Sequence, residues 1–408
     1  MELEKIRNYA RLLAGMGVAT KQGDEVWITA QAEAFEFARL VAEECYKLGA
    51  KNVRVKFYDE KIDRLDYEYM ALRDLCKVPS YQIADIKYRI KNLPSVLFID
   101  SDDPDAFKGI NVKKLTKTSM AWGKKTKPLY DEMECKYKWS IGAIPSKSWA
   151  KKVFPNLSEE EAVEKLWDAI LSVSRAKEGD PLENWKKHNE NLIAHREKLG
   201  SLNLQYLEYK ASNGTDFKVE LIKGINWGAG IEKTDKGATF NPNIPSEEVF
   251  TSPKAGSCEG ILYASKPLSY QGQLIEDFWV KFENGKVSDV GAKKNQKLLE
   301  DMVKMDEGAS MLGEVALVPF ESPINESGIL FYNTLFDENA VCHVALGMGF
   351  KDCLPNGQNM SNEDAHKLGI NDSMIHVDFM VGTRDLEIVG TSFDGKKTVI
   401  FKNGTWAI

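Results

Sequence analysis

The spacing of hydrophobic residues changes near residue 200, and this change limits the folds open to the chain. Before it, short apolar runs such as 25–30 (EVWITA), 52–59 (NVRVKFYD) and 95–100 (SVLFID) alternate with longer amphipathic segments such as 33–49. Strand, helix and strand joined by short links are typical of a parallel sheet with helical crossovers. We therefore expect an α/β domain in the first half of the chain.

Predicted strands dominate the second half. Asn–Gly and Asp–Gly pairs, which are strong turn signals, separate several β-prone segments there, and one predicted helix at 295–308 interrupts them. We place the change of pattern within 190–205. The sequence thus predicts an α/β N-terminal domain over 1–195 and a mixed, β-rich α+β C-terminal domain over 196–408.

Charge and composition narrow the partners and the compartment. The net charge of −7 argues against a nucleic-acid backbone as partner, and no run of eighteen apolar residues exists that could cross a membrane. The first residues form a charged amphipathic pattern without the apolar core of a signal peptide. Six scattered cysteines contain no C-x-x-C pair, which is typical of free thiols in a reducing compartment. We expect a cytoplasmic protein with no nucleic-acid partner and no membrane partner.

One strongly apolar segment, 374–382 (MIHVDFMVG), carries a histidine and an aspartate. The segment is predicted as a buried strand, in which alternate residues face the same way. His376 and Asp378 should therefore project side by side. A buried carboxylate needs a partner, so the two residues either satisfy each other or both point at a metal ion.

Three further residues occupy unusual positions for their type. Glu314 opens the apolar segment GEVALVPF, His343 follows an apolar run in DENAVCHVALG, and Glu248 closes a proline-punctuated loop. Each carboxylate could equally be an exposed surface charge. His188 and His195, by contrast, lie in the charged helical segment 183–200, and we expect both on the surface.

The combined set of two histidines and three carboxylates favours a metal site. Mixed imidazole and carboxylate ligation suits zinc, cobalt or manganese, with magnesium kept open, and it does not suit calcium or an iron–sulfur cluster. Three carboxylates exceed what one catalytic zinc requires. With bridging they can hold two divalent ions that activate a shared water. The predicted metal ligands are Glu248, Glu314, His343, His376 and Asp378.

Three segments of the second half, NPNIPSEEVFTSP, GEVALVPFESPINESGILFYNTLFDENAVCHVALG and IHVDFMVGT, resemble the thermophilic aminopeptidase family of two-metal peptidases, the aminopeptidase T, aminopeptidase S and PepS type. The opening of the chain and the segment WAKKVFPNLSEEEAVEKLWDAI resemble the same family, so the likeness spans essentially the whole length. The resemblance selects the same five residues as metal ligands. It also implies a homodimer and short peptide substrates with a free N-terminus.

Metal-assisted hydrolysis is the mechanism that the resemblance implies, with removal of single N-terminal residues. Two cations would polarise the scissile carbonyl and lower the pKa of a bridging water. A nearby carboxylate must then carry a proton from the water to the leaving amine, and Glu314 is our candidate. Glu247 or Glu321 could hold the substrate ammonium group.

Position 350 departs from the family pattern. The resemblance implies a tyrosine seven residues after His343, where this chain has Phe350. Losing that hydroxyl could weaken catalysis, which keeps open a metal-binding protein with weak or lost activity.

Cys258 in GSCEG imitates a nucleophile elbow but lies in a β-rich stretch. A dinucleotide site is disfavoured because no G-x-G-x-x-G follows the first strand.

Overall fold

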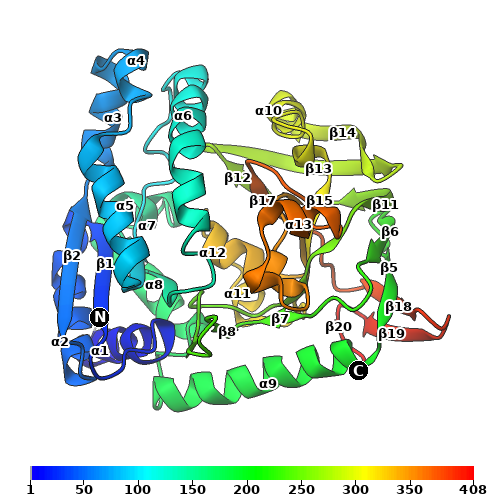
Figure 1. Ribbon diagram of the computed structural model, residues 1–408, viewed down its shortest axis with the longest axis horizontal. Helices are drawn as coiled ribbons and strands as arrows, with labels where there is room; N and C mark the ends of the chain where they lie inside the picture. Colours follow the sequence, from blue (N-terminus) through cyan, green and yellow to red (C-terminus); the bar gives the residue numbers. More distant parts are fainter. Residues whose placement is uncertain (1) are drawn as a thin grey trace. The chain divides into compact units, whose positions relative to one another are not determined.

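The computed structural model describes residues 2–408 and is shown in Figure 1. Its contacts divide the chain into two compact units. The first comprises Met1–Lys186 with Ile231–Ile244, and the second comprises Lys187–Gly230 with Pro245–Ile408. This division falls within one long helix, α9 (Pro181–Ser201), which also contains the predicted boundary at 195/196. That boundary stays a prediction. The short return of the chain to the first unit had no signal in the sequence.

A four-stranded parallel sheet forms the centre of the first unit, in the order β2-β1-β3-β4. The strands are β1 (Glu25–Gln31), β2 (Asn52–Tyr58), β3 (Ser95–Asp100) and β4 (Trp139–Ala143). In β1 five of the seven residues are buried, as expected of a central strand covered on both faces. The predicted α/β architecture of the first half is confirmed.

Helices connect these strands and cover the sheet. They are α1 (Leu3–Leu12), α2 (Phe35–Lys47), α3 (Glu60–Tyr69), α4 (Leu72–Leu75), α5 (Ser80–Asn92), α6 (Val112–Asp131), α7 (Lys147–Val153) and α8 (Glu159–Val173). A π-helical turn (Leu13–Gly17) extends α1. The remaining pair, β8 (Glu232–Lys233) and β9 (Thr239–Phe240), forms a small antiparallel ribbon.

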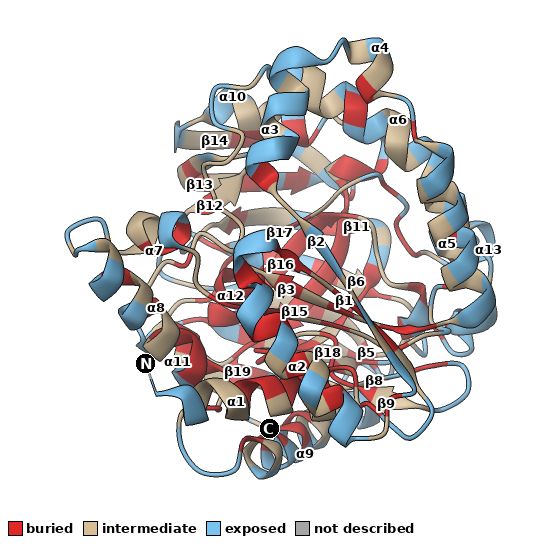
Figure 2. Cartoon of the chain, turned by 90° about the vertical axis from the view of Figure 1, so that its left-hand side faces the viewer, coloured by how far each residue is buried: buried red, intermediate tan, exposed pale blue. Residues whose placement is uncertain are grey.

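Helix α8 shows how local sequence sets the elements of this unit. Ser158 and Glu161 form a capping box, in which each side chain accepts a hydrogen bond from the backbone N–H of the other residue. Ala162, Leu166 and Ile170 follow at intervals of four residues and are buried on one face. The outer faces of α2 and α3 are exposed to solvent, as Figure 2 shows.

The second unit is built on two antiparallel sheets. The five-stranded sheet has the order β17-β16-β15-β10-β7, with strands β7 (Gly228–Ala229), β10 (Val249–Thr251), β15 (Leu312–Leu317), β16 (His343–Gly347) and β17 (His376–Met380). The nine-stranded sheet contains β5 (Leu204–Lys210), β6 (Asp216–Leu221), β11 (Pro253–Tyr263), β12 (Leu268–Tyr270), β13 (Gln273–Glu283), β14 (Lys286–Lys294), β18 (Glu387–Ser392), β19 (Lys397–Lys402) and β20 (Thr405–Trp406). The expected β-rich second half is confirmed. Its short helices are α10 (Gln296–Met302), α11 (Pro323–Glu326), α12 (Thr334–Asp337) and α13 (Asn362–Lys367).

One hydrophobic core joins the two sheets of this unit. Val315 and Phe379 of the five-stranded sheet belong to the same buried cluster as Leu207, Val219 and Phe282 of the nine-stranded sheet. Burying such side chains typically contributes about 1.5–3 kcal/mol each. The core fixes one face of the five-stranded sheet in place, and its opposite face is the one that carries the polar residues described next.

Candidate metal centre

The predicted metal ligands lie on three neighbouring strands and at the edge of a fourth. Glu314 is on β15, His343 on β16, and His376 and Asp378 on β17, while Glu248 directly precedes β10. These strands are adjacent in the five-stranded sheet, although their residues are separated by up to 130 positions in the sequence. The structure thus brings all five predicted residues together in the second unit.

The strand register explains why they share one face. Ala345 is paired with both Glu314 and Asp378, and Gly347 is paired with His376. Directly paired residues on antiparallel strands place their side chains on the same face, about 5 Å apart. Because Ala345 and Gly347 are small, the strand between the two carboxylates leaves room above the sheet.

The ligand atoms of the five residues approach each other closely. His343 Nε2 lies 3.1 Å from Glu248 Oε2, and His376 Nε2 lies 3.2 Å from Glu314 Oε2 and 3.4 Å from Asp378 Oδ1. All four residues other than His376 are at least nine-tenths buried. The atoms form two groups, each within 4.8 Å, namely Glu248–Glu314–His343 and Glu314–His376–Asp378. Glu314 belongs to both.

Both histidines are oriented by backbone carbonyl groups. The Nδ1 atom of His376 is 2.7 Å from the carbonyl oxygen of Met348, and that of His343 is 3.3 Å from the carbonyl oxygen of Val341. A carbonyl partner favours the N–H on Nδ1 and leaves the lone pair on Nε2. A hydrogen bond from Nδ1–H to a carbonyl oxygen is the usual partner interaction of an imidazole that binds a metal through Nε2.

Burial and mutual repulsion perturb the protonation of the cluster. Burial, together with the nearby Glu248 and Asp378, raises the pKa of Glu314 to about 7. Burial by itself would lower the pKa of His343, but the neighbouring carboxylates outweigh it and raise that pKa to about 10. Without a cation, these carboxylates are balanced only by two imidazoles that must hold extra protons. Such a cluster is better matched by bound positive charge.

A buried carboxylate oxygen of Asp378 indicates that the cluster can accept a metal ion. The Oδ1 atom of Asp378 has no hydrogen-bond partner among the described residues, and its approach of 3.4 Å to His376 is too long and poorly aligned to serve as one. An orphaned buried carboxylate oxygen is costly. The donor set of imidazole nitrogen and carboxylate oxygen suits a divalent transition metal, so the residues fit such an ion.

Glu338 is a further carboxylate of this centre that the sequence did not reveal. Burial raises the pKa of Glu338 well above the ordinary value, and the charges of Asp378 and Glu248 raise it further. Glu338 follows α12 in a short 3₁₀ turn and accepts a hydrogen bond from Asn339 at 3.3 Å. Its neighbours in sequence give it no strand alternation, so no local pattern could have identified it.

Phe350 lies beside the cluster. Its ring centroid is 5.0 Å from that of His376 and 5.4 Å from that of Phe250, and its backbone N–H donates to Ser252 Oγ at 2.7 Å. The ring therefore packs against one of the predicted metal ligands, which makes the substitution open to test. The importance of the missing hydroxyl stays a prediction.

The other candidates take different positions. Glu247 is buried, and its Oε2 atom is 3.9 Å from Nε2 of His188. Glu321 is exposed and accepts a hydrogen bond from Thr405. Neither position decides which carboxylate would hold a substrate ammonium, so that role stays a prediction.

Two expectations about individual residues are settled by their burial. His188 was expected on the surface, but it is 9% exposed and hydrogen-bonds through Nε2 to the carbonyl oxygen of Ser246, so this prediction is wrong. The helix face that carries it packs against the rest of the second unit. Cys258 is 2% exposed inside β11, and burial raises the pKa of its thiol to about 12, which excludes it as a nucleophile.

Comparison with known proteins places this arrangement in a family. The family model described as thermophilic metalloprotease (M29) matches residues 2–406. The chain belongs to this family. Aminopeptidase AmpS of Bacillus subtilis is 38% identical over 405 residues, covering 99% of this chain and 98% of that protein. Aminopeptidase T of Thermus aquaticus is 36% identical over 406 residues, with 99% of each protein covered. These matches confirm the predicted family and the prediction of a metal-dependent aminopeptidase acting on peptides.

Solved structures agree with this assignment. The wild-type AmpT structure from Thermus thermophilus superposes on this M29 chain with a TM-score of 0.90 at 34% identity, covering 99% of both chains. A 2,5-dihydroxypyridine dioxygenase from Pseudomonas putida shares the fold with a TM-score of 0.51 at 11% identity. Since a fold of this kind also serves a dioxygenase, the chemistry must be argued from the residues of the site.

None of the helices within 2–408 combines the length and the apolar character that a membrane span requires.

Proposed function

We propose that this M29 chain removes single residues from the free N-termini of short peptides, using two divalent cations held by Glu248, Glu314, His343, His376 and Asp378. The observation that carries the proposal is the pair of ligand groups that share Glu314. A carboxylate common to two groups can bridge two ions about 3.5–4 Å apart. Zinc, cobalt, manganese or magnesium would suit these oxygen and nitrogen donors.

When bound, the cations would supply Lewis acidity and an activated water nucleophile. The protein groups then have separate tasks. The carbonyl groups of Met348 and Val341 keep the two imidazoles oriented. Glu314 carries the proton from the water to the leaving amine. Glu338 is a second candidate for this proton transfer, because a carboxylate that bridges two ions has fewer free lone pairs.

Several finer properties belong to the same proposal. Specificity for a free N-terminus needs an anionic partner for the substrate ammonium, and Glu247 and Glu321 are the candidates named from the sequence. The family likeness supports a homodimer and short peptide substrates. Cysteine usage and charge support a cytoplasmic location without nucleic-acid or membrane partners.

The metal stoichiometry and the specificity for free N-termini can be measured separately. Elemental analysis of metal-loaded protein should give close to two ions per chain, and a value of zero would overturn the metal centre. A leucine-headed peptide should be cleaved while its N-acetylated form resists. Equal cleavage of both forms would refute the exopeptidase specificity even if the metals are present.

The proton-transfer role needs its own experiment. Glu314→Gln and Glu338→Gln should both be loaded with metal and assayed. If Glu314 carries the proton, the increase of kcat with rising pH disappears in Glu314→Gln and persists in Glu338→Gln. The metal content of each variant indicates whether a metal ligand was lost as well. An intact pH profile in Glu314→Gln would assign the role elsewhere.

A further inference from the structure

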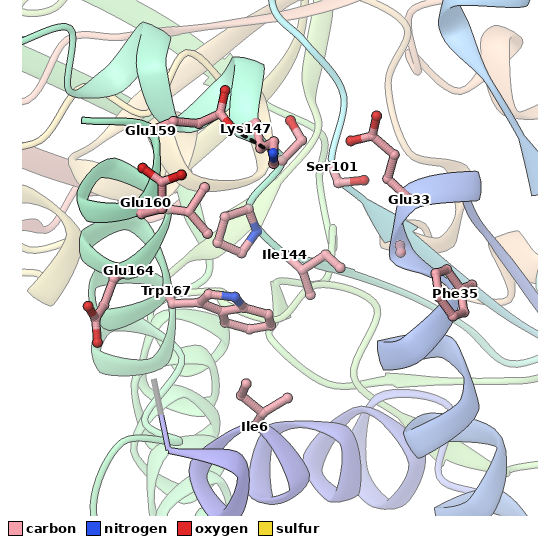
Figure 3. Close-up of a pocket in the computed structure, with 14 residues that line it drawn as sticks. Ile6, Glu33, Phe35, Ser101, Ile144, Lys147, Glu159, Glu160, Glu164 and Trp167 are labelled. Carbon is pink, nitrogen blue, oxygen red and sulfur yellow. Dashed lines mark ion pairs between the residues drawn. The ribbon is translucent and has the colours of Figure 1, made fainter. Parts of the chain in front are cut away.

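A large cavity opens at the carboxyl edge of the parallel sheet in the first unit. It has a volume of about 780 Å³, and the segments after β1, β3 and β4 line it together with α1 and α8 (Figure 3). All of its lining residues belong to the first unit, whereas the metal centre is built from residues of the second unit. The proposed catalytic function does not use this cavity.

The strand order makes this position a natural binding site. Strand β1 lies between β2 and β3, so the connections that leave β1 and β3 run to opposite sides of the sheet. In open parallel sheets, ligands bind in the crevice that such diverging connections leave at the carboxyl ends of the strands. Glu33 and Phe35 follow β1, and Ser101 follows β3 directly.

Aromatic and aliphatic side chains form the walls. Phe35 and Trp167 lie on different sides of the cavity in Figure 3, with Ile6 and Ile144 between them. Phe35 is 40% exposed, and the guanidinium group of Arg39 lies over its ring at 4.8 Å from the ring centroid. The indole of Trp167 is held by an edge-on contact with Phe37 at 5.8 Å between ring centroids. This fixed surface suits an apolar or aromatic group of a ligand.

The charges around the cavity are mainly negative. Four glutamates line it, and two of them are paired with lysines: Glu159 with Lys147 at 2.6 Å and Glu33 with Lys61 at 3.1 Å. Glu160 and Glu164 lie on the same helix one turn apart, and Figure 3 shows the Glu164 carboxylate at the side of α8 away from the indole of Trp167. Carboxylates beside an indole face form a favourable environment for an ammonium group, through charge attraction and cation–π contact.

A buried hydroxyl gives an independent indication of a ligand. Ser101 is 3% exposed, and its Oγ atom has no hydrogen-bond partner among the described residues. Ser101 lines the cavity between Glu33 and Lys147, as Figure 3 shows. An unpaired buried hydroxyl costs free energy, and a polar ligand group placed in the cavity would satisfy it.

We propose that this cavity is a second binding site for small ligands that carry a primary ammonium group next to an apolar or aromatic side chain. The ammonium group lies beside Glu160 and the face of Trp167, the apolar group packs against Phe35 and Ile144, and a polar atom of the ligand bonds the hydroxyl of Ser101. Peptides with a free N-terminus and free amino acids share this chemistry.

Calorimetric titration of the metal-loaded full-length protein with 2-phenylethylamine tests the proposal, because this amine contains no bond for a peptidase to cut. N-acetyl-2-phenylethylamine lacks the charge, and 3-phenylpropionate reverses it. We expect binding of the amine alone. Binding of 3-phenylpropionate as tight as that of the amine would overturn the proposal.

Variants locate the binding event. The double substitution Glu160→Gln/Glu164→Gln, at two exposed residues, should weaken amine binding about five- to tenfold. Ser101→Ala should weaken it about threefold. Both variants should keep the kcat/KM of the parent for peptide cleavage. Glu36→Gln, an equally exposed glutamate on α2 outside the cavity, is the matched control. If the double variant binds the amine as tightly as the parent while Glu314→Gln loses binding, the amine occupies the metal centre and the proposal fails.

Two further probes separate the natural sources of such a ligand. L-Phenylalanine represents free amino acids, and a Phe-Phe analogue with a reduced, uncleavable peptide bond represents peptides. Because a free amino acid brings its carboxylate close to the glutamates, we expect the dipeptide analogue to bind more tightly. Either ligand supports the proposal if its binding weakens in the double variant, and binding of neither overturns it.

Discussion

The two units of this protein each gather carboxylates, but they place them in different environments. On the antiparallel sheet of the second unit, three buried carboxylates lie within hydrogen-bonding or near-contact distance of two imidazoles. At the edge of the parallel sheet in the first unit, four glutamates lie around a wide cavity with aromatic walls, and three of them, Glu33, Glu160 and Glu164, are exposed. The first arrangement suits bare cations, and the second suits an organic ammonium group.

Sheet geometry accounts for the difference. Antiparallel pairing aligns side chains across strands at about 5 Å, a spacing at which several ligands can meet on one ion. The carboxyl edge of a parallel sheet instead collects loops, whose separation leaves room for a molecule of several atoms. The same residue type therefore acquires a function from its burial and from the spacing of its neighbours.

The largest expected effect contrasts one glutamate from each region. Glu314→Gln should lower kcat/KM by about 10³-fold or more, because it removes a residue shared by both ligand groups and the proposed proton carrier. Glu164→Gln should leave kcat/KM unchanged. Assays with an amino-acid p-nitroanilide, combined with metal analysis, measure both. Retention of more than a tenth of the parent activity by Glu314→Gln would show that the metal centre does not depend on it.

A smaller effect is expected from restoring the hydroxyl that the family pattern places at position 350. Phe350→Tyr should raise kcat several-fold and at most about 10²–10³-fold, the range for one oxyanion-type donor. Metal content should not change, since the ring already packs against His376. Tyr332→Phe serves as the companion variant: a loss of kcat there, with no gain from Phe350→Tyr, would mean that Tyr332 supplies the donor.

Metal removal should destabilise the second unit in a pH-dependent manner. In the metal-free protein the folded-state pKa values of Glu314 and His343 are raised, to about 7 and about 10. A group whose pKa is higher in the folded state than in the unfolded state stabilises the fold at pH values below its unfolded-state pKa. This stabilisation is lost as the pH rises through its folded-state pKa. The metal-free protein should therefore be less stable at pH 9 than at pH 6, whereas metal binding strengthens as these groups lose protons.

Thermal unfolding with and without a chelator at both pH values measures this coupling. At a free metal concentration of 100 times Kd, binding to the folded state alone adds about 2.7 kcal/mol. The change in Tm on chelation should be larger at pH 9 than at pH 6. An equal change at the two pH values would show that no proton is exchanged for metal at these residues.

The smallest effect concerns the first unit, where no metal contributes. Ser158→Ala removes the N-cap hydroxyl of α8 and should lower the free energy of unfolding by about 1 kcal/mol, with the same cost in the presence and absence of chelator. Urea unfolding monitored by circular dichroism measures it. A cost that depended on the chelator would mean that the two units do not respond independently.

Local patterns in the sequence predicted the elements and part of the site. Strand alternation correctly placed His376 and Asp378 on one face, and Ser158 and Glu161 have the S-x-x-E spacing of the capping box that the structure contains. Local patterns failed where burial depends on distant residues. His188 lies in a charged helix, yet it is buried, and its ring nitrogen lies 2.7 Å from the carbonyl oxygen of Ser246, which is distant in the sequence.

The sequence by itself determined which segments are strands and helices, because alternation, capping and turn residues act between near neighbours. Only the tertiary structure decided that Glu314, Ala345 and Asp378 align across three strands, that burial raises the pKa of Glu338, and that β1 has β2 and β3 on its two sides. Register and strand order are set by hydrogen bonds and core packing between segments far apart in the chain, and neither leaves a local pattern. The distances between ligands and the shape of the cavity follow from those non-local choices.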